Sequence, residues 1–587
     1  MLGLLLLLAG CQPSRPVVAA APPSATASLR PALDPAAAAT LTADAPTPAM
    51  VTDPDFLAPG RAVYARDLLF RQDRLRRAAD AMADGPERDR YRHTMALVEQ
   101  TRHDWPQVTR FRVEARGEGL ALTPLDWQAE IAVKRELHPR LAVVGGELES
   151  VIIAMAAADH GWPVALVYAG PLGGLCSDTG GNLRYFDGEP FLPRPQAQSR
   201  LFRDALGMAA HNYCALPRDI SARLERYLRG SYARSITLVP TRSYNSLHVE
   251  VRGERIAGVV TEEGLRVAAD AFIDTDPEAR VGEKAGLTPS MVTPNLSYGL
   301  VFDVDGLREP DWAHLPTKLT PERVCALAHT STAALPVGSA ARHSADTMRH
   351  LATSEQTHVF STTRFGYSTL AEGFNLYMQC RGLHDTDPEL RWLNAARCTS
   401  GFNISLSGGR ATFNSVSYHL VASVLQEDHD LRTDDRLRAL MRIERPALES
   451  YLKSFFQDRN VRVLFPPQFY VRKASALFAM AHPYGSPDFL ATMPRPGSVG
   501  LWMSYAMDLR DLRPRDEIER ASMADFEGFA GGRRTWRCRG SATKTAFENL
   551  YLCNKSAMPA RYYGGMRILQ NLISTGVALV GDLAAGR

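Results

Sequence analysis

The segment 140–187 constrains the fold of this chain more than any other part of it. It reads RLAVVGGELESVIIAMAAADHGWPVALVYAGPLGGLCSDTGGNLRYFD. Its pattern predicts a buried strand at Leu141 to Val144, followed by a turn at Gly145 and Gly146. A buried helix is predicted at Leu148 to His160, and a second strand at Pro163 to Tyr168. Strand, turn, helix and strand within about thirty residues predict a βαβ unit, the core of a dinucleotide-binding domain.

The glycine turn departs from the G-x-G-x-x-G pattern of such domains. In that pattern the first glycine permits the turn, the second lets a diphosphate approach the backbone, and the third lets helix and strand pack closely. Gly145 matches the first position, whereas Glu147 and Ser150 stand at the second and third. The second strand ends in Tyr168, where an acidic residue usually binds the ribose; a phenol can still donate to a ribose or stack on adenine. Alone, this motif is weak evidence for a cofactor.

Further motifs follow in a set order. GPLGG at Gly170 to Gly174 and TGGN at Thr179 to Asn182 form a second glycine-rich segment. LPRDISARLERYL predicts a helix, the stretch from Ser235 to Asp274 predicts a meander of strands with a turn at Gly253, and the chain ends in NLYLCNKSAMPARYYGGMRILQNLISTGVALVGDLAA. With these motifs, roughly residues 139–585 resemble the FAD-dependent oxidoreductases of the glutathione-reductase-like group, especially its bacterial members.

The resemblance implies an FAD cofactor and an oxidoreductase that acts on a small organic substrate. It places the cofactor at Gly145, Gly146, Glu147, Leu148, Tyr168, Gly173, Gly174, Asp274, Gly564 and Gly565. Asp274 begins the segment Asp274 to Pro277, where the family has Ala-Thr-Gly-Asp. Arg472 falls where the family carries an arginine turn facing the flavin, so it is the candidate catalytic residue, with Tyr418 and His419 as alternatives.

The expected fold class is α/β: a Rossmann-like FAD-binding domain (a ββα sandwich with a β-meander), an inserted α+β substrate domain and an N-terminal helical extension. The expected regions are a signal peptide at 1–11, a linker at 12–53, a helical region at 54–138, the first part of the FAD-binding-like domain at 139–290, the substrate domain at 291–465 and the rest of the FAD-binding-like domain at 466–587. Helices are predicted at Arg61 to Asp84, Arg88 to Arg102, Pro124 to Leu137, Gln198 to Tyr213, Pro217 to Leu228 and Thr433 to Glu444, and from Pro446 to Phe456.

The N-terminus resembles a bacterial lipoprotein signal. Leu2 to Ala9 is a short apolar run, and Leu8 to Cys11 resembles the cleavage box that leaves Cys11 as an acylated N-terminus. Gln12 to Met50 is rich in Ala and Pro and nearly free of aromatics, which predicts a disordered tether. The expected location is extracytoplasmic, on the periplasmic side of a bacterial membrane, with a fortuitous apolar N-terminus as the alternative.

Composition excludes some partners. Hydrophobic residues make up 45% and charged residues 22% of the 587, which is typical of a globular protein. The net charge of +3 comes without a basic, aromatic-rich run, so nucleic acid is not expected, and the 15 histidines show no paired ligand spacing that indicates a metal.

The cysteines leave their pairing open. Eight are present, and seven remain beside Cys11, so an exported chain would keep at least one free thiol. Cys380 and Cys398 flank an expected hairpin and are the first candidates for a disulfide, although buried thiols are an equally good interpretation. Cys176 lies in the glycine-rich segment but has no C-x-x-C partner.

Two functions are compatible with this sequence. One is a membrane-tethered FAD-dependent oxidoreductase, with an unknown redox partner. The other is a flavoprotein-like domain that has lost its cofactor and acts as a binding or scaffold protein; Glu147, Tyr168 and the segment Thr275 to Pro277 favour it. The retained glycine-rich turns favour the enzyme, although glycine also persists wherever the backbone needs a positive φ.

Overall fold

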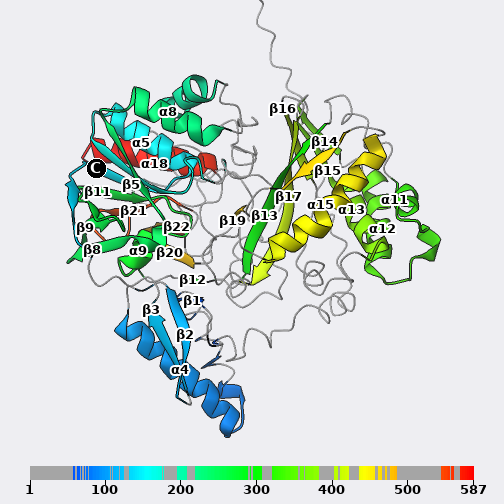
Figure 1. Ribbon diagram of the computed structural model, residues 1–587, viewed down its shortest axis with the longest axis horizontal. Coiled ribbons are helices and arrows are strands. Elements are labelled where there is room, and N and C mark those ends of the chain that lie inside the picture. Colours follow the sequence, from blue (N-terminus) through cyan, green and yellow to red (C-terminus); the bar gives the residue numbers. More distant parts are fainter. Residues whose placement is uncertain are drawn as a thin grey trace, which may run out of the picture. The chain divides into compact units, whose positions relative to one another are not determined.

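The computed structural model describes residues within six ranges of the chain, each with gaps: 57–176, 195–207, 219–306, 320–382, 402–484 and 544–586. The described part is mixed α/β, with one wholly parallel sheet and four sheets that contain antiparallel pairs (Figure 1). Within it, no helix is long and apolar enough to cross a membrane. The predicted signal peptide with Cys11, and the predicted linker, lie outside the described residues.

The predicted βαβ unit is confirmed, and it lies at the centre of a five-stranded parallel sheet. Strand β5 (Leu141–Val144) leads through helix α5 (Leu148–Asp159) to strand β6 (Val164–Ala169). The strand order is β21-β11-β5-β6-β7, with β7 at Ile236–Thr241, β11 at Ala271–Asp274 and β21 at Leu550–Leu552. Because β6 and β11 flank β5 on opposite sides, the strand order reverses at β5, and ligands of open α/β sheets bind at such a switch point.

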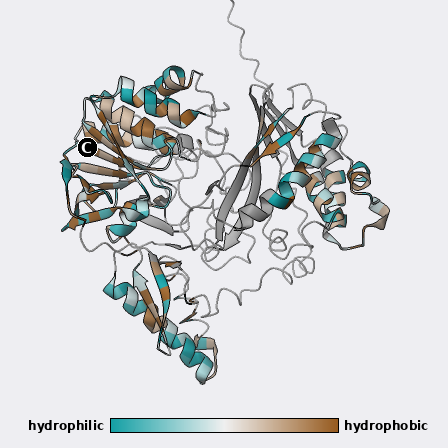
Figure 2. Ribbon diagram, viewed as in Figure 1, coloured by the Kyte–Doolittle hydropathy of each residue, from teal (hydrophilic) through white to brown (hydrophobic). Residues whose placement is uncertain are grey.

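Both faces of this sheet are covered. Leu141 and Val143 belong to the apolar core that includes α5, whereas Ala142 and Val144 belong to a second core that includes the meander strands. All four side chains are fully buried, which explains why β5 is apolar throughout rather than alternating. Figure 2 accordingly shows the strands of this sheet mostly in the brown of apolar residues.

Helix α5 packs closely against the C-terminal helix α18 (Leu569–Ala584). A Cβ added at Gly576 of α18 would lie only 2.1 Å from Cδ1 of Ile153 in α5. Glycine at this position therefore lets the two helices approach each other, and it explains why the apolar C-terminal segment is part of the same domain as β5.

The middle of the meander predicted for Ser235 to Asp274 is confirmed in the second sheet, of order β4-β10-β9-β8, whereas β7 and β11 at its two ends belong to the parallel sheet. Its strands are β8 (His248–Arg252), β9 (Arg255–Val260) and β10 (Leu265–Val267), with the expected turn at Gly253, where φ is +58°. The fourth strand, β4 (Arg135–Leu137), pairs in parallel with β10. The helix predicted for Pro124 to Leu137 is therefore wrong at both of its described ends, because Pro124 closes strand β3.

The N-terminal region is not purely helical, contrary to expectation. It contains an antiparallel sheet of order β1-β2-β3, at Ala62–Tyr64, Arg110–Arg116 and Gly119–Pro124. The predicted helix at Arg88 to Arg102 is confirmed as α4 (Pro86–Asp104). The helix predicted for Arg61 to Asp84 was predicted to start too early, because β1 occupies 62–64 and the described helical residues lie within 65–81. Phe111 and Val113 of β2 alternate with arginines at period two and bury their side chains.

Six strands of the region expected to form the substrate domain, 291–465, form a seven-stranded antiparallel sheet together with β19, which lies just beyond the expected end. Its order is β14-β15-β16-β17-β13-β18, with β19 also paired to β13, at Thr357–Ser361, Arg364–Tyr367, Phe402–Ser407, Arg410–Val421, Asn295–Asp305, Arg462–Leu464 and Tyr470–Val471. Its helices are α11 (Pro321–Leu327), α12 (Ala340–Thr353), α13 (Ser368–Cys380) and α15 (Asp435–Phe456). Pro446 lies inside α15, so the two helices predicted around it are one.

The remaining elements are short. Helix α7 (Gln196–Arg200) continues as a π-helical turn to Leu206, α8 (Ile220–Ser231) covers the parallel sheet beside α5, and α9 (Arg280–Lys284) follows β11. A third small sheet joins β12 (Met291–Val292), β20 (Ala476–Tyr484) and β22 (Ala557–Ala560).

Candidate functional site

The candidate site lies at the carboxyl ends of β5, β6 and β11, where the sequence concentrates glycines and polar residues. Gly145 directly follows β5, and its N–H donates to the Val167 carbonyl of β6 over 2.8 Å. A Cβ at Gly145 would lie 2.0 Å from Oγ1 of Thr275 and 2.9 Å from Oγ of Ser150. No larger residue fits at this turn, so the first glycine of the pattern is required by packing alone.

The serine at the third position of the pattern has a structural partner. Oγ of Ser150 lies 2.8 Å from Oγ1 of Thr275, and both residues are fully buried. Because the single Thr275 hydroxyl proton is donated to the Val144 carbonyl at 2.9 Å, the Ser150 hydroxyl is the donor of this pair. The hydrogen bond joins α5 to the residue after β11, which explains how a side chain is tolerated where a glycine is usual.

Glu147 joins the two glycine-rich segments. It is the N-cap residue of α5, and its backbone forms an isolated β-bridge with Gly173, whose N–H donates to the Gly146 carbonyl over 2.8 Å. Its carboxyl group lies against Gly174: a Cβ there would be 2.3 Å from Cδ and within 2.5 Å of both carboxyl oxygens. The half-buried Glu147 side chain therefore covers the second glycine loop at the N-terminus of α5.

The hydroxyl of Tyr244, which sequence reasoning missed, lies beside the same turn. Its oxygen accepts a hydrogen bond from the backbone of Ala169 at the end of β6, and it would be 3.3 Å from a Cβ at Gly146. Burial raises the pKa of this phenol strongly, and the nearby charge of Asp276 adds to the effect; the hydroxyl end is enclosed although the residue is only half-buried overall. No pattern marked Tyr244, because it lies in a short 3₁₀ turn (Tyr244–Ser246) between β7 and β8.

Tyr168 lies in the core that includes α5 and α8, and it is almost fully buried. Burial raises the pKa of its phenol, and the charge of Glu225 on α8 raises it further. Its proposed contact with a ribose stays a prediction. Cβ of Tyr168 would lie 3.3 Å from a Cβ at Gly146, so the base of the side chain adjoins the turn.

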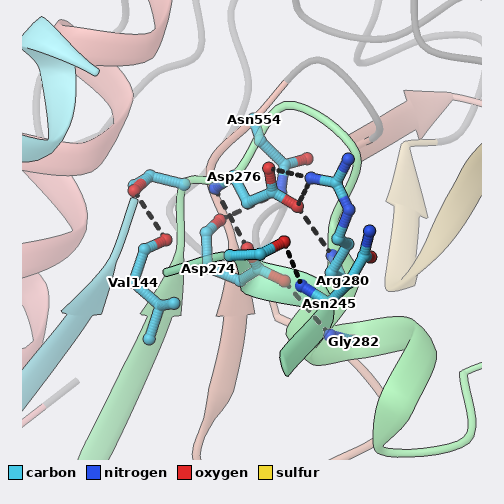
Figure 3. Close-up of polar contacts among 9 residues, drawn as sticks. Val144, Asn245, Asp274, Asp276, Arg280, Gly282 and Asn554 are labelled. Atoms are coloured by element: carbon cyan, nitrogen blue, oxygen red, sulfur yellow. Dashed lines mark hydrogen bonds and ion pairs between the residues drawn. The ribbon is translucent and has the colours of Figure 1, made fainter. Parts of the chain in front are cut away.

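Asp274 ends β11 in a buried polar cluster (Figure 3). Its carboxylate accepts backbone N–H groups of Asp276 and Gly282, each at 3.1 Å. Its own carbonyl accepts the side-chain amide of Asn554 at 3.0 Å and the N–H of Cys553 at 2.9 Å. Burial raises the pKa of Asp274 well above its usual value, and the negative charge of Asp276 raises it further.

Asp276 has a charged partner of its own. Nη1 of Arg280 donates to both carboxylate oxygens, at 2.7 and 2.9 Å, and the Arg280 backbone N–H donates to Oδ2 at 3.0 Å. The pair is buried and lies at i,i+4 spacing, which was the one sequence clue to it. Asp274 and Asp276 thus hold the loop between β11 and α9 in shape, and this accounts for the Asp-Thr-Asp-Pro sequence without any ligand.

Three predicted site residues cannot be placed. Arg472, Gly564 and Gly565 lie outside the described residues, and so does the whole of TGGN with the segment after it. The structure does bring together Gly145, Gly146, Glu147, Gly173 and Gly174, and it places Leu148 in the core as the first residue of α5.

Comparison with known proteins gives fold neighbours of low similarity. No family model and no curated protein matches the chain. Among solved structures, an FAD-dependent oxidoreductase from Pseudomonas aeruginosa is 15% identical with a TM-score of 0.22; the match covers 30% of this chain and 57% of that one. Glycine oxidases from Bacillus cereus and Geobacillus kaustophilus are 10% and 12% identical, with TM-scores of 0.34 and 0.31, and the matches cover 76% and 77% of this chain and 95% of each oxidase.

Proposed function

We propose that this chain is an FAD-dependent oxidoreductase whose cofactor lies across the carboxyl ends of β5 and β6. The observation that carries the proposal is the junction of the two glycine-rich segments: the Gly173 N–H donates to the Gly146 carbonyl at the N-terminus of α5. A helix N-terminus at the switch point of a parallel sheet offers backbone N–H groups and a positive dipole end to a diphosphate.

The glycine-rich backbone suits the cofactor, whereas the side chains of Glu147 and Tyr244 lie in the same turn. Gly145 and Gly146 lie where a diphosphate would approach, and Gly174 leaves space that a Cβ would fill. The Glu147 carboxyl group occupies that space in this structure. Two unit charges about 5 Å apart repel by about 3 kcal/mol at an effective dielectric of about 20, so a diphosphate requires Glu147 to turn away or to be protonated.

The chain's own residues would bind and orient, while a bound flavin would supply the redox step. Amides of the first turn of α5 would hold the diphosphate, and Gly173 and Gly174 would allow the rest of the cofactor to lie close to the backbone. Arg472 remains our proposal for the catalytic residue, and Gly564 and Gly565 for a turn near the flavin. A small organic substrate is part of the same proposal.

A second function is favoured by a specific observation. The Glu147 carboxyl group on Gly174 and the Tyr244 hydroxyl beside Gly146 fill the turn with the protein's own side chains. Asp274 and Asp276 are likewise satisfied by backbone and Arg280 donors. A flavoprotein-like domain without a cofactor, acting as a binding or scaffold protein, would have these features.

We also propose that the protein is exported and tethered to a bacterial membrane through an acylated Cys11. The support is the apolar run before Cys11 and the Ala- and Pro-rich stretch after it. This proposal concerns the location and is independent of the cofactor.

The visible spectrum of the purified full-length chain separates the two functions. An FAD enzyme is expected to be yellow and to release FAD on denaturation. A protein that is colourless as purified, and stays so after refolding with excess FAD, would contradict the oxidoreductase and leave the scaffold function.

A further inference from the structure

Two cysteines of the helical part of the 291–465 region lie side by side. Sγ of Cys325 in α11 is 3.8 Å from Sγ of Cys380, the last residue of α13. The two positions are 55 residues apart in the chain, so only the packing of these helices brings them together. Cys325 is fully buried and Cys380 is half-buried.

The helices that carry the two thiols are held in place by other contacts. The Thr320 hydroxyl accepts the Arg323 N–H at 3.2 Å and so caps the start of α11. In α13, the Leu370 carbonyl accepts the hydroxyl of the buried Tyr451 at 3.2 Å, which ties the helix to α15. The sulfur atoms are therefore neighbours in a fixed frame, and side-chain rotation with a small backbone adjustment would bring them to bonding distance, about 2.05 Å.

The surroundings of Cys325 and Cys380 suit a structural disulfide better than a dithiol pair that exchanges rapidly. Burial and the neighbouring Cys325 raise the pKa of Cys380 to about 12, and burial raises the pKa of Cys325. Cysteines that exchange rapidly have a lowered pKa and partial exposure, which produce the thiolate. These two are protonated and largely enclosed, so a bond between them would be slow to exchange and would serve the structure.

We propose that Cys325 and Cys380 form a structural disulfide in the exported protein. Each thiol loses its proton, the pair gives up two electrons as the S–S bond forms, and a protein disulfide of the oxidising compartment is reduced to two thiols. Cys380 is the more accessible sulfur, so the mixed disulfide forms there and Cys325 displaces the oxidant. The proposal rests on the export proposed above and is independent of the flavin.

This pairing replaces the one expected from the sequence. Cys380 is the last residue of α13, and the segment between it and Cys398, where the hairpin was expected, lies outside the described residues from 383 onward. Cys398 lies outside the described residues, and its bond to Cys380 becomes an outcome that the experiment must detect. Cys176 and Cys553 are buried elsewhere, in the core that includes α5.

The test is peptide mapping without reduction. The full-length chain, with its N-terminal segment, is produced in a bacterium, free thiols are blocked with N-ethylmaleimide at lysis, and the digest is analysed by mass spectrometry. We expect a Cys325–Cys380 linked peptide two hydrogens lighter than its parts. Cys325→Ser should leave Cys380 blocked by maleimide, whereas the control Cys176→Ser should keep the linked peptide.

A second experiment separates the proposed export of the protein from the proposed geometry of the two thiols. The folded chain is reduced, the reductant is removed and oxidised glutathione is added. If the native protein carries free thiols but glutathione links Cys325 to Cys380, the geometry is supported and the proposed export is contradicted. If neither preparation contains the link, or Cys380 is bound to Cys398, the disulfide proposal is overturned. The colour of the protein does not enter either outcome.

Discussion

The carboxyl group of Glu147 occupies the space where a side chain at Gly174 would begin: a Cβ at Gly174 would be 2.3 Å from Cδ of Glu147. One residue belongs to the first glycine-rich turn and the other to the second, and their backbones are joined by the bridge between Glu147 and Gly173. This contact places the protein's own carboxylate at the turn where the proposed diphosphate would bind.

Replacing Glu147 with glycine should raise FAD affinity by at least about tenfold, because it removes a negative charge and bulk from the diphosphate path. Titration of the purified chain with FAD, followed by quenching of flavin fluorescence, measures the effect. Glu147→Gln is the matched control: it removes the charge and keeps the size, so a gain seen only with glycine assigns the effect to bulk. An unchanged affinity in both variants would count against a diphosphate at this turn.

Gly174→Ala should destabilise the protein by about 1–3 kcal/mol, because the new methyl group collides with the Glu147 carboxyl group. In a Glu147→Gly background the same substitution should cost less, since only the strain of a positive φ, +50° at Gly174, remains. Urea denaturation of the four proteins gives the coupling energy directly. Equal costs in both backgrounds would show that the two side-chain positions do not interact.

The sequence predicted the architecture around this contact but not the contact itself. Leu141 to Val144, the glycines after it and the apolar α5 are local patterns, and they determine the βαβ unit by themselves. The direction of the Glu147 side chain depends on Gly174, which is 27 positions away, and no local pattern encodes that distance.

The errors in the sequence predictions have similar causes. The β2–β3 hairpin was not predicted, although β2 alternates apolar and charged residues with the period of a half-buried strand. Pro446 is a helix breaker by propensity, yet α15 passes through it with Leu448 and Tyr451 buried on its packed side. Tertiary packing overrode the local preference at Pro446. Tertiary packing also brings Cys325 next to Cys380, which no local pattern predicts.

Ser150→Ala should cost about 1 kcal/mol of stability, because it removes the donor to Thr275 in a buried pair. A double-mutant cycle with Thr275→Val should show coupling of similar size, measured by chemical denaturation. FAD affinity should not change, since the hydroxyl is fully buried between α5 and the residue after β11. Additive costs would mean that the 2.8 Å contact contributes nothing on its own.

The cost of Asp274→Asn should depend on pH. The folded pKa of Asp274 is raised, so the folded state favours the protonated acid, and the stability this provides is fully present below the unfolded pKa of about 3.9. It is lost as pH rises through the folded pKa. The stability difference between wild type and Asp274→Asn should therefore be largest near pH 4 and shrink toward neutral pH, by about 1.4 kcal/mol for each unit by which the pKa is raised. Denaturation curves of the two proteins across this range test it.

The Cys325–Cys380 bond should make the exported protein sensitive to reductant. A crosslink across 55 positions restricts the unfolded chain and adds up to about 4 kcal/mol of stability in the chain-entropy model. Melting of the native protein should therefore shift to lower temperature when a dithiol is added, because reduction restores that chain entropy to the unfolded state. Cys325→Ser should melt at one temperature with and without the dithiol, whereas Cys176→Ser should still respond. A native protein whose melting temperature is unchanged after the dithiol has fully reduced it would show that the two sulfur atoms are in contact but not bonded.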